Sequence, residues 1–264
     1  MKKESIVFDI KGKYGLFKKP YSPLSPISFP VPPPTSIYGM IGAIVGFSKN
    51  ATNENYYLKL MNSGEIQVGI VLLEKVRRYR TGLNLLITKG TQFFRPKGNH
   101  LPEKGNEKQR QETPRTQIPA EFIANPKFRI FFYHSNSEIM EALEYQLIKA
   151  KRTVYTPSLG LASCIAEIEF NGNFPGKFPI EEINKPGKKR LNCVVPLSRA
   201  KIHYKQGKNL FRFRLPALMA TDRTVTYYED VVINEDTGPI EVEVESYEKI
   251  GEDFLLLIKP QATT

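Results

Sequence analysis

The chain has 264 residues, of which 41% are hydrophobic and 25% charged, and this composition excludes wholesale disorder, a collagen-like rod and a pure coiled coil. Thirty-eight Lys and Arg residues against 27 Asp and Glu residues leave a net charge of +11, which suggests a polyanionic partner. The longest apolar stretch, residues 40–47, is far shorter than the roughly 18 residues of a membrane span, so no membrane association is expected. The first residues lack the apolar block of an export signal, which favours a cytoplasmic location.

Local patterns predict one strand and one helix near the N-terminus. Residues 5–10 are β-rich and are expected to form the first strand. Seven prolines in residues 20–34 exclude a helix or a central strand there. A short helix is expected to follow, capped by Thr35 or Ser36 and ending near Gly46.

Glycine is frequent on one side of this predicted helix, at positions 39, 42 and 46. Each glycine inside a helix costs roughly 1 kcal/mol relative to alanine. We therefore expect a neighbouring element to approach this side closely, and the sheet is the expected neighbour.

The middle of the chain predicts a long strand pair with a projecting arm. A second short helix near residues 55–61 precedes a strand over 65–73, which continues through the basic and aromatic residues 77–80. Residues 90–117 are polar, rich in Gly and Pro, and too long for an ordinary connection, so they predict an arm or hairpin tip. The later elements are a strand over 127–133, a helix opened by a capping box at 135–138 with Ile139, Leu143 and Leu147 on one face, and a strand over 167–170.

This order of elements matches the split βαβ or ferredoxin-like plan, which is also the RRM framework. After a punctuating stretch at 171–187, only short strands are predicted, at 191–195, 211–215, 231–234, 240–244 and 254–258. We therefore expect an α+β fold. Residues 1–170 would form a ferredoxin-like (RRM-like) domain with a long β-hairpin arm at about 90–117, and residues 171–264 a small β-rich domain.

Charge is unevenly distributed along the chain. Residues 75–129 hold 13 bases and 4 acids, residues 185–214 hold 10 bases and no acid, and residues 229–253 hold 10 acids and 1 base. This distribution suggests one face that binds a polyanion and a separate acidic face that meets a basic partner. Solvated surfaces of an ordinary basic protein are the alternative interpretation.

Cations and aromatic residues alternate at several places, and single-stranded RNA recognition needs both kinds of side chain. In the tetrad 211–214, Phe211 and Phe213 would share one strand face, and a core role is favoured for them over base stacking. For residues 77–80 the RNA-binding interpretation is favoured. The RNA-binding candidates from this pattern are Lys13, Tyr14, Lys18, Lys19, Arg77, Arg78, Tyr79, Arg80 and Arg95.

Other site chemistry is poorly supported by the sequence. Cys164 and Cys193 belong to neither a disulfide framework nor a zinc motif, and no glycine-rich segment matches a phosphate loop, so no metal or cofactor is expected. The triplet from His203 to Lys205 has residue types that could cleave RNA without a metal. Adjacent strand residues point to opposite faces, however, which favours an ordinary surface strand.

Several segments of the chain resemble the CRISPR-associated Cas five family of the RAMP superfamily, with type I-B members most similar. The resemblance covers about two-thirds of the chain and weakens after Asn171. The segments are residues 8–30, PPTSIYGMIGAIVG at 33–46, RTQIP at 115–119 with Glu121 and Phe122, residues 125–130, and YTPSLG at 155–160.

The resemblance implies a noncatalytic subunit of a type I Cascade complex. Such a subunit binds the 5′ handle of the CRISPR RNA, caps the backbone filament, and contacts the backbone subunit and the large subunit, meeting target DNA only indirectly. The arm would be the family's thumb. Tyr38 and Arg115, which lie in matching segments, join the RNA-binding candidates.

One branch of the family, in type I-C systems, cleaves precursor CRISPR RNA with a Tyr, Lys and His set. Its tyrosine follows an Ala-Ile pair, where this chain has Val45 after Ala43 and Ile44, and residues 110–117 hold no histidine. These departures argue for a noncatalytic subunit. The alternatives are a metal-independent endoribonuclease with His203 or Tyr38 as general base, and a generic RNA-binding protein outside any complex.

Overall fold

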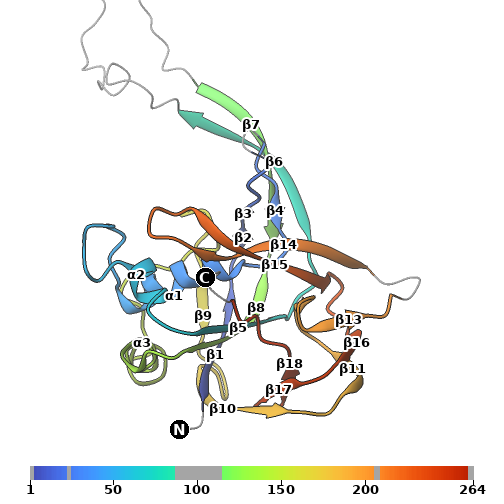
Figure 1. Cartoon of the computed structure of the whole chain (residues 1–264). Coiled ribbons are helices and arrows are strands. Elements are labelled where there is room, and N and C mark those ends of the chain that lie inside the picture. The colour runs from blue at the N-terminus through green and yellow to red at the C-terminus, as the bar shows by residue number, and fades with distance from the viewer. Residues whose placement is uncertain (1–2, 23–24, 87–114, 205–208, 261–264) are drawn as a thin grey trace, which may run out of the picture.

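The computed structural model describes residues 3–22, 25–86, 115–204 and 209–260, and strands dominate it (Figure 1). Its largest sheet has the strand order β18-β17-β10-β1-β8-β5, and β9 also pairs with β1. β1 runs antiparallel to β8, β9 and β10, and β5 runs antiparallel to β8. The strands are β1 (Glu4–Lys11), β5 (Ile66–Leu72), β8 (Lys127–His134), β9 (Glu167–Glu169), β10 (Gly176–Ile183), β17 (Tyr247–Ile250) and β18 (Asp253–Leu255).

The described residues also form three three-stranded sheets and one two-stranded sheet. The first three have the orders β2-β7-β6, β12-β15-β14 and β11-β16-β13, and the last pairs β3 with β4. Their bounds are β2 (Tyr14–Gly15), β3 (Phe17–Lys18), β4 (Ser28–Phe29), β6 (Arg78–Leu86), β7 (Arg115–Ala124), β11 (Gly187–Leu191), β12 (Val195–Pro196), β13 (Ala200–Ile202), β14 (Leu210–Met219), β15 (Val225–Asn234) and β16 (Ile240–Val244).

The largest sheet is covered on both faces. Phe8 of β1 lies in one hydrophobic core, and its neighbour Val7 lies in the other. All seven residues of β5 are buried, as expected for a strand that is covered on both sides. A Cβ at Gly69 would lie 2.5 Å from the Cδ1 of Leu255, so this glycine lets the C-terminal segment pack directly on the strand.

Helix α1 (Pro34–Val45) begins on a proline, whose fixed φ suits the first helical position. Its N-cap is Pro33 and no side chain caps it, so the predicted capping by Thr35 or Ser36 is wrong. The predicted end is confirmed, because Gly46 has the left-handed φ of 93° at the C-cap.

On the glycine side of α1, Gly42 faces helix α2 (Tyr57–Met61) and Gly46 faces Val154, and neither faces the expected sheet. A Cβ at Gly42 would lie 3.0 Å from the Cβ of Tyr57, which corrects the predicted neighbour. A Cβ at Gly39 would meet no described atom within 4 Å. The helix is therefore closely packed at one glycine and open at another.

Helix α3 (Ser137–Glu144) continues into a π-helical turn, η3 (Tyr145–Lys149). Its cap is Asn136, whose side chain accepts a hydrogen bond of 2.9 Å from the backbone N–H of Glu138, so the predicted capping box is wrong. None of the helices in the described part of the chain is long and apolar enough to cross a membrane. The predicted apolar face is confirmed by the burial of Ile139, Leu143 and Leu147.

The C-terminal half of the chain joins the same sheet as the N-terminal half. β10 pairs with both β1 and β17, so the interpretation of residues 171–187 as a punctuating stretch is wrong. Leu215 and Val231 also lie in one core with Phe8. The division into domains at residue 171 stays a prediction, and the structure adds that the two parts share a sheet and a core.

Candidate nucleic-acid interface

β6 and β7, which flank most of the predicted arm along the chain, form an antiparallel ribbon that rises from the body of the molecule (Figure 1). We call this ribbon the stem. β2 adds a third strand at the base of this ribbon. Tyr79 lies opposite Phe122, and Tyr14 lies opposite Ala124. Since side chains alternate along a strand, Tyr14, Tyr79 and Phe122 share one face of the stem.

These three rings contact one another. The ring centroids of Tyr14 and Tyr79 are 5.7 Å apart in a stacked arrangement, and those of Tyr14 and Phe122 are 6.0 Å apart edge to face. Phe122 is buried, whereas Tyr79 is 47% exposed. The Nζ of Lys13 lies 6.0 Å from the centroid of the Tyr14 ring. We call Lys13, Tyr14, Tyr79 and Phe122 the stem platform. Phe122 was not among the predicted RNA contacts, because its place beside Tyr14 and Tyr79 depends on the pairing of β2, β6 and β7.

Arg77 lies two residues before Tyr79, is exposed, and lines a recess of about 340 Å³ beside the platform. The other cations of this recess have carboxylate partners: Lys11 and Lys127 share Glu169 at 3.0 and 2.8 Å, and Lys75 pairs with an aspartate. Among the described residues, no carboxylate forms an ion pair with Arg77. Its guanidinium is therefore available to an incoming anion.

Arg78 and Arg80 lie on the face of the stem opposite the platform. Arg78 forms a two-fold hydrogen bond with Glu235, and this hydrogen bond raises the pKa of Arg78. The Nε of Arg80 donates to Glu121 at 2.9 Å. Both carboxylates are buried, so these two arginines neutralise acids of the protein itself, and their RNA contacts stay a prediction.

Tyr38, a predicted RNA contact, is a core residue. Its side chain is completely buried, and its hydroxyl donates to the carbonyl of Ala217 at 2.8 Å. Burial raises the pKa of this phenol well above its ordinary value. The Tyr38 hydroxyl is therefore enclosed by the core and engaged by a backbone carbonyl.

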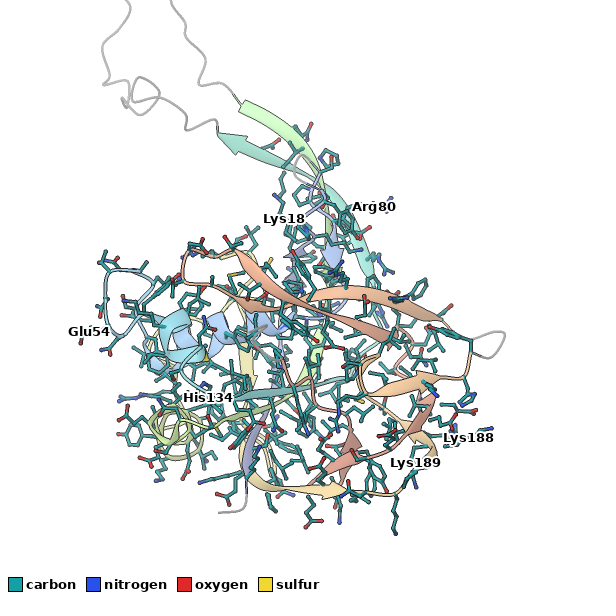
Figure 2. All side chains as sticks on the ribbon, in the orientation of Figure 1. Lys18, Glu54, Arg80, His134, Lys188 and Lys189 are labelled. Atoms are coloured by element: carbon teal, nitrogen blue, oxygen red, sulfur yellow. The ribbon has the colours of Figure 1, made fainter. Side chains whose placement is uncertain are left out.

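Lys19 lies among aromatic rings, with its Nζ 5.1 Å from the centroid of Phe213 and 5.7 Å from that of Phe29. The expected core role fits Phe213, which is partly buried against the main core, while Phe211 is 43% exposed. Lys18 is exposed on β3. Figure 2 shows Lys18 and Arg80 at the base of the stem.

Two candidates cannot be placed beside these residues. Arg95 lies outside the described residues, as do most of the predicted arm at 90–117 and the side chain of Arg115, the first residue of β7. The RNA contacts of both arginines stay predictions.

The acidic run at 229–253 is not a separate acidic face, which corrects the prediction from charge distribution. Several of its carboxylates pair with bases of the basic tracts and of the body. The pairs include Glu235 with Arg78, Asp236 with Lys75, Asp230 with Arg212, Asp253 with Arg129, and Glu248 with Arg199 and Lys259. The run therefore supplies internal counter-charges to a basic protein.

Within the described ranges, His, Cys, Asp and Glu side chains do not gather in groups of three or more that could hold a metal ion. Cys164 and Cys193 are both free and buried. Burial raises the pKa of Cys193 to about 12, so its thiol is protonated at neutral pH. His203 lies 3.4 Å from Glu243 at the edge of the β11-β16-β13 sheet.

No family model matches the chain, and no curated protein matches it. Its fold is similar to the crystal structure of a CRISPR protein from Archaeoglobus fulgidus, with a TM-score of 0.52 and 12% sequence identity over 98% of this chain and all of that one. A chain of a CRISPR RNA-guided surveillance complex gives a TM-score of 0.45 at 11% identity, covering 94% of this chain and 91% of that one. A chain of the type III-B Cmr-beta complex bound to cognate target RNA and AMPPnP gives a TM-score of 0.48 at 11% identity, covering 90% of this chain and 86% of that one. The first similarity shows that the chain has the fold of a CRISPR protein.

Proposed function

We propose that the protein is a noncatalytic, RNA-binding subunit of a CRISPR surveillance complex. More narrowly, we propose a Cas five subunit, with type I-B as the subtype, that binds the 5′ handle of the CRISPR RNA and contacts the backbone and large subunits. The observation that carries RNA binding is the stem platform, where an exposed tyrosine stacks on a second ring beside Lys13 and Arg77. The fold shared with a CRISPR protein supports the setting.

The platform supplies the two interactions that unpaired RNA needs. Tyr79 presents a half-exposed ring on which a base can stack, worth about 1–3 kcal/mol per base. Lys13 lies over the adjoining Tyr14 ring and Arg77 lies two residues before Tyr79 along the chain, and both can neutralise phosphates. Since the buried Phe122 holds Tyr14 beneath Tyr79, the stacking surface is preorganised.

The ferredoxin-like assignment is part of this proposal. The strand order β9-β1-β8-β5 supports it, because each neighbouring pair is antiparallel. Helix α1 lies between β1 and β5 along the chain, and α3 lies between β8 and β9. These are the connections of two interlocked βαβ units.

The noncatalytic role is proposed from the state of the alternative bases. Tyr38 is buried and hydrogen-bonded, and burial raises its pKa, which opposes its use as a base. The endoribonuclease alternative would then depend on His203, which lies beside Glu243. No described feature favours that alternative over RNA binding.

The test uses the full-length chain, labelled RNA and fluorescence anisotropy. We expect tighter binding to a repeat-derived 5′ handle than to a scrambled RNA of equal length, and uncut RNA after incubation in EDTA. Replacing Tyr79 with alanine should weaken binding about 10-fold, since a stacked base is lost. Tyr145→Ala, which removes another half-exposed tyrosine from η3, is the matched control. Equal affinity for both RNAs, or a discrete cleavage product, would contradict the proposal.

A further inference from the structure

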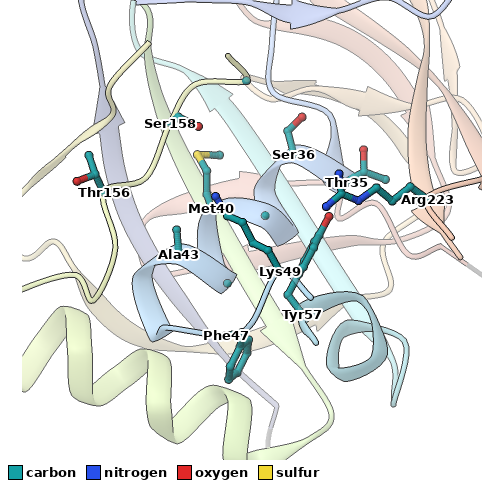
Figure 3. A pocket seen from close by; sticks show the side chains of 13 residues that line it. Thr35, Ser36, Met40, Ala43, Phe47, Lys49, Tyr57, Thr156, Ser158 and Arg223 are labelled. Atoms are coloured by element: carbon teal, nitrogen blue, oxygen red, sulfur yellow. The ribbon is translucent and has the colours of Figure 1, made fainter. Parts of the chain in front are cut away.

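A polar recess of about 310 Å³ lies beside α1, and no residue of the stem platform lines it (Figure 3). Four separate segments line it: α1, the stretch from Phe47 to Tyr57, the loop at 156–160, and Arg223. Arg223 comes from the turn between β14 and β15. The recess therefore exists only in the folded chain.

Its lining has the chemistry of an anion site. Lys49 and Arg223 are both exposed cations, and Figure 3 shows the Arg223 guanidinium beside the Tyr57 hydroxyl. None of the described residues that line the recess is acidic. The hydroxyl groups come from Thr35, Ser36, Tyr57, Thr156 and Ser158. Two cations without a counter-charge, surrounded by hydroxyl donors, favour a phosphate.

The backbone of Arg223 is held in a conformation that suits glycine. Its φ is +70°, and its N–H donates to the carbonyl of Ala220 at 2.9 Å, which closes the turn. A non-glycine residue in this region costs of order 1 kcal/mol. At this strained position the chain carries a long cationic side chain that reaches the recess, and such positions cluster at ligand sites.

A second recess, of about 350 Å³, adjoins the first, because Thr35, Ser36 and Gly160 line both. Its other walls are mostly apolar. They comprise Leu16, Phe17, Lys18, Pro20, Pro33, Leu161, Pro216, Met219, Val225 and Tyr228. Leu161 is 39% exposed at this surface, so the apolar wall is open to a flat ligand.

We infer that the two recesses together bind one nucleotide of an RNA strand, with its phosphate between Lys49 and Arg223 and its base in the apolar recess. This inference rests on the proposed function, in which the protein binds an RNA strand. A nucleotide joins an anion, a hydroxyl-bearing sugar and a flat apolar base, and the recesses present matching surfaces in that order. Residues 16–18 line the apolar recess and follow Tyr14 closely along the chain. One RNA strand can therefore reach both the stem platform and this site.

The first test replaces Arg223 with glycine in the full-length chain and measures binding of a labelled single-stranded RNA at several salt concentrations. Affinity should fall about 10-fold, because a hydrogen-bonded charge is lost, and the salt slope should fall by about 0.7. The melting temperature should be unchanged or higher, since glycine relieves the positive φ. Lys59→Ala, which removes an exposed cation of α2 outside both recesses, should bind like wild type. An Arg223→Gly variant with wild-type affinity and salt slope would overturn the inference.

The apolar recess is tested by Leu161→Glu, with Ile165→Glu as the matched control. Both side chains are exposed, at 39% and 57%, but only Leu161 lines the recess. The carboxylate at 161 should lower RNA affinity about 10-fold or more, by opposing both base burial and the nearby phosphate. Equal losses in the two variants would indicate a general charge effect and reject the base site.

Failure of this inference is distinguishable from failure of the proposed function. If Tyr79→Ala weakens RNA binding while the recess variants bind like wild type, the stem platform stands and the nucleotide site is rejected. If the wild-type chain binds no RNA, the proposed function fails, and titration with uridine 5′-monophosphate then decides the recess alone. Saturable binding that Arg223→Gly abolishes would support the nucleotide site, and no binding would overturn it.

Discussion

Tyr38 and Tyr79 belong to the same set of predicted RNA contacts, but their surroundings give them different roles. Tyr79 is half exposed on the stem, where its ring is accessible on top of Tyr14. Tyr38 is enclosed by the core, and its hydroxyl satisfies the carbonyl of Ala217 on β14. A tyrosine ring can stack on an RNA base only where the ring reaches solvent.

Replacing Tyr38 with phenylalanine should therefore lower stability and leave RNA affinity unchanged. The ring still fills the core, but the Ala217 carbonyl loses its donor, which costs about 1–3 kcal/mol. Urea unfolding and RNA anisotropy of the same sample measure the two effects. Tyr155→Phe, at an exposed tyrosine, is the control. Weaker RNA binding at unchanged stability would restore Tyr38 as an RNA contact.

At the scale of elements, two glycines that lie inside regular secondary structure differ in the space around them. Gly69 of β5 is pressed by the buried side chains of Leu255 and Leu257. Gly39 of α1 faces the polar recess, with open space where its Cβ would be. The first glycine is required by a close approach, and the second leaves room for a ligand.

Substituting alanine at these two glycines should change stability in opposite directions. Gly69→Ala places a Cβ 2.5 Å from Leu255, and this overpacking should destabilise the fold by about 1–3 kcal/mol. Gly39→Ala should stabilise it by up to about 1 kcal/mol, because alanine is the better helix former and meets no neighbour. Thermal unfolding of the two variants measures both effects. Equal melting temperatures would show that Leu255 moves aside freely.

At the scale of the whole molecule, carboxylates of the chain itself offset part of its large positive charge. The acidic run near the C-terminus neutralises arginines and lysines that lie far away in the sequence, such as Arg78 and Arg129. The cations that remain without a described carboxylate partner include Arg77 and those of the polar recess. The surface available to a polyanion is therefore smaller and more local than the net charge suggests.

Stability should fall in acid, because several carboxylates have lowered pKa values in the folded state. Hydrogen bonds from Lys127 and Lys11 lower the pKa of Glu169, and a hydrogen bond from Lys177 lowers that of Glu144, both from the usual 4.5. Such a group stabilises the fold above its unfolded pKa, and this contribution is lost as the pH falls through the folded pKa. We expect the melting temperature to drop between about pH 4.5 and pH 3. Glu169→Gln should reduce the drop, and a flat profile in the wild type would contradict this account.

Local patterns predicted much of the fold. Strands at β1, β5 and β8, the end of α1 at Gly46, and the buried face of α3 were all indicated by alternation, glycine position and helical spacing. The caps of both helices were predicted wrongly. Helix α1 begins at prolines and has no side-chain cap. At α3, Ser135 and Asn136 are both able to cap, and only the final backbone path selects Asn136. β10 was missed because none of its residues is fully buried and Pro179 lies within it, which argues against a strand in the sequence.

The sequence by itself determined the basic character of the protein, several of its strands and helices, and the aromatic residues beside cations at the stem, because these follow from composition and from neighbours a few residues apart. Only the tertiary structure decided which cations stay accessible, since Arg78 meets Glu235 across 157 residues of chain. It also decided that Tyr38 is enclosed and that Lys49 and Arg223 meet at one recess. Contacts between distant segments depend on how the sheet assembles, and no local pattern carries that information.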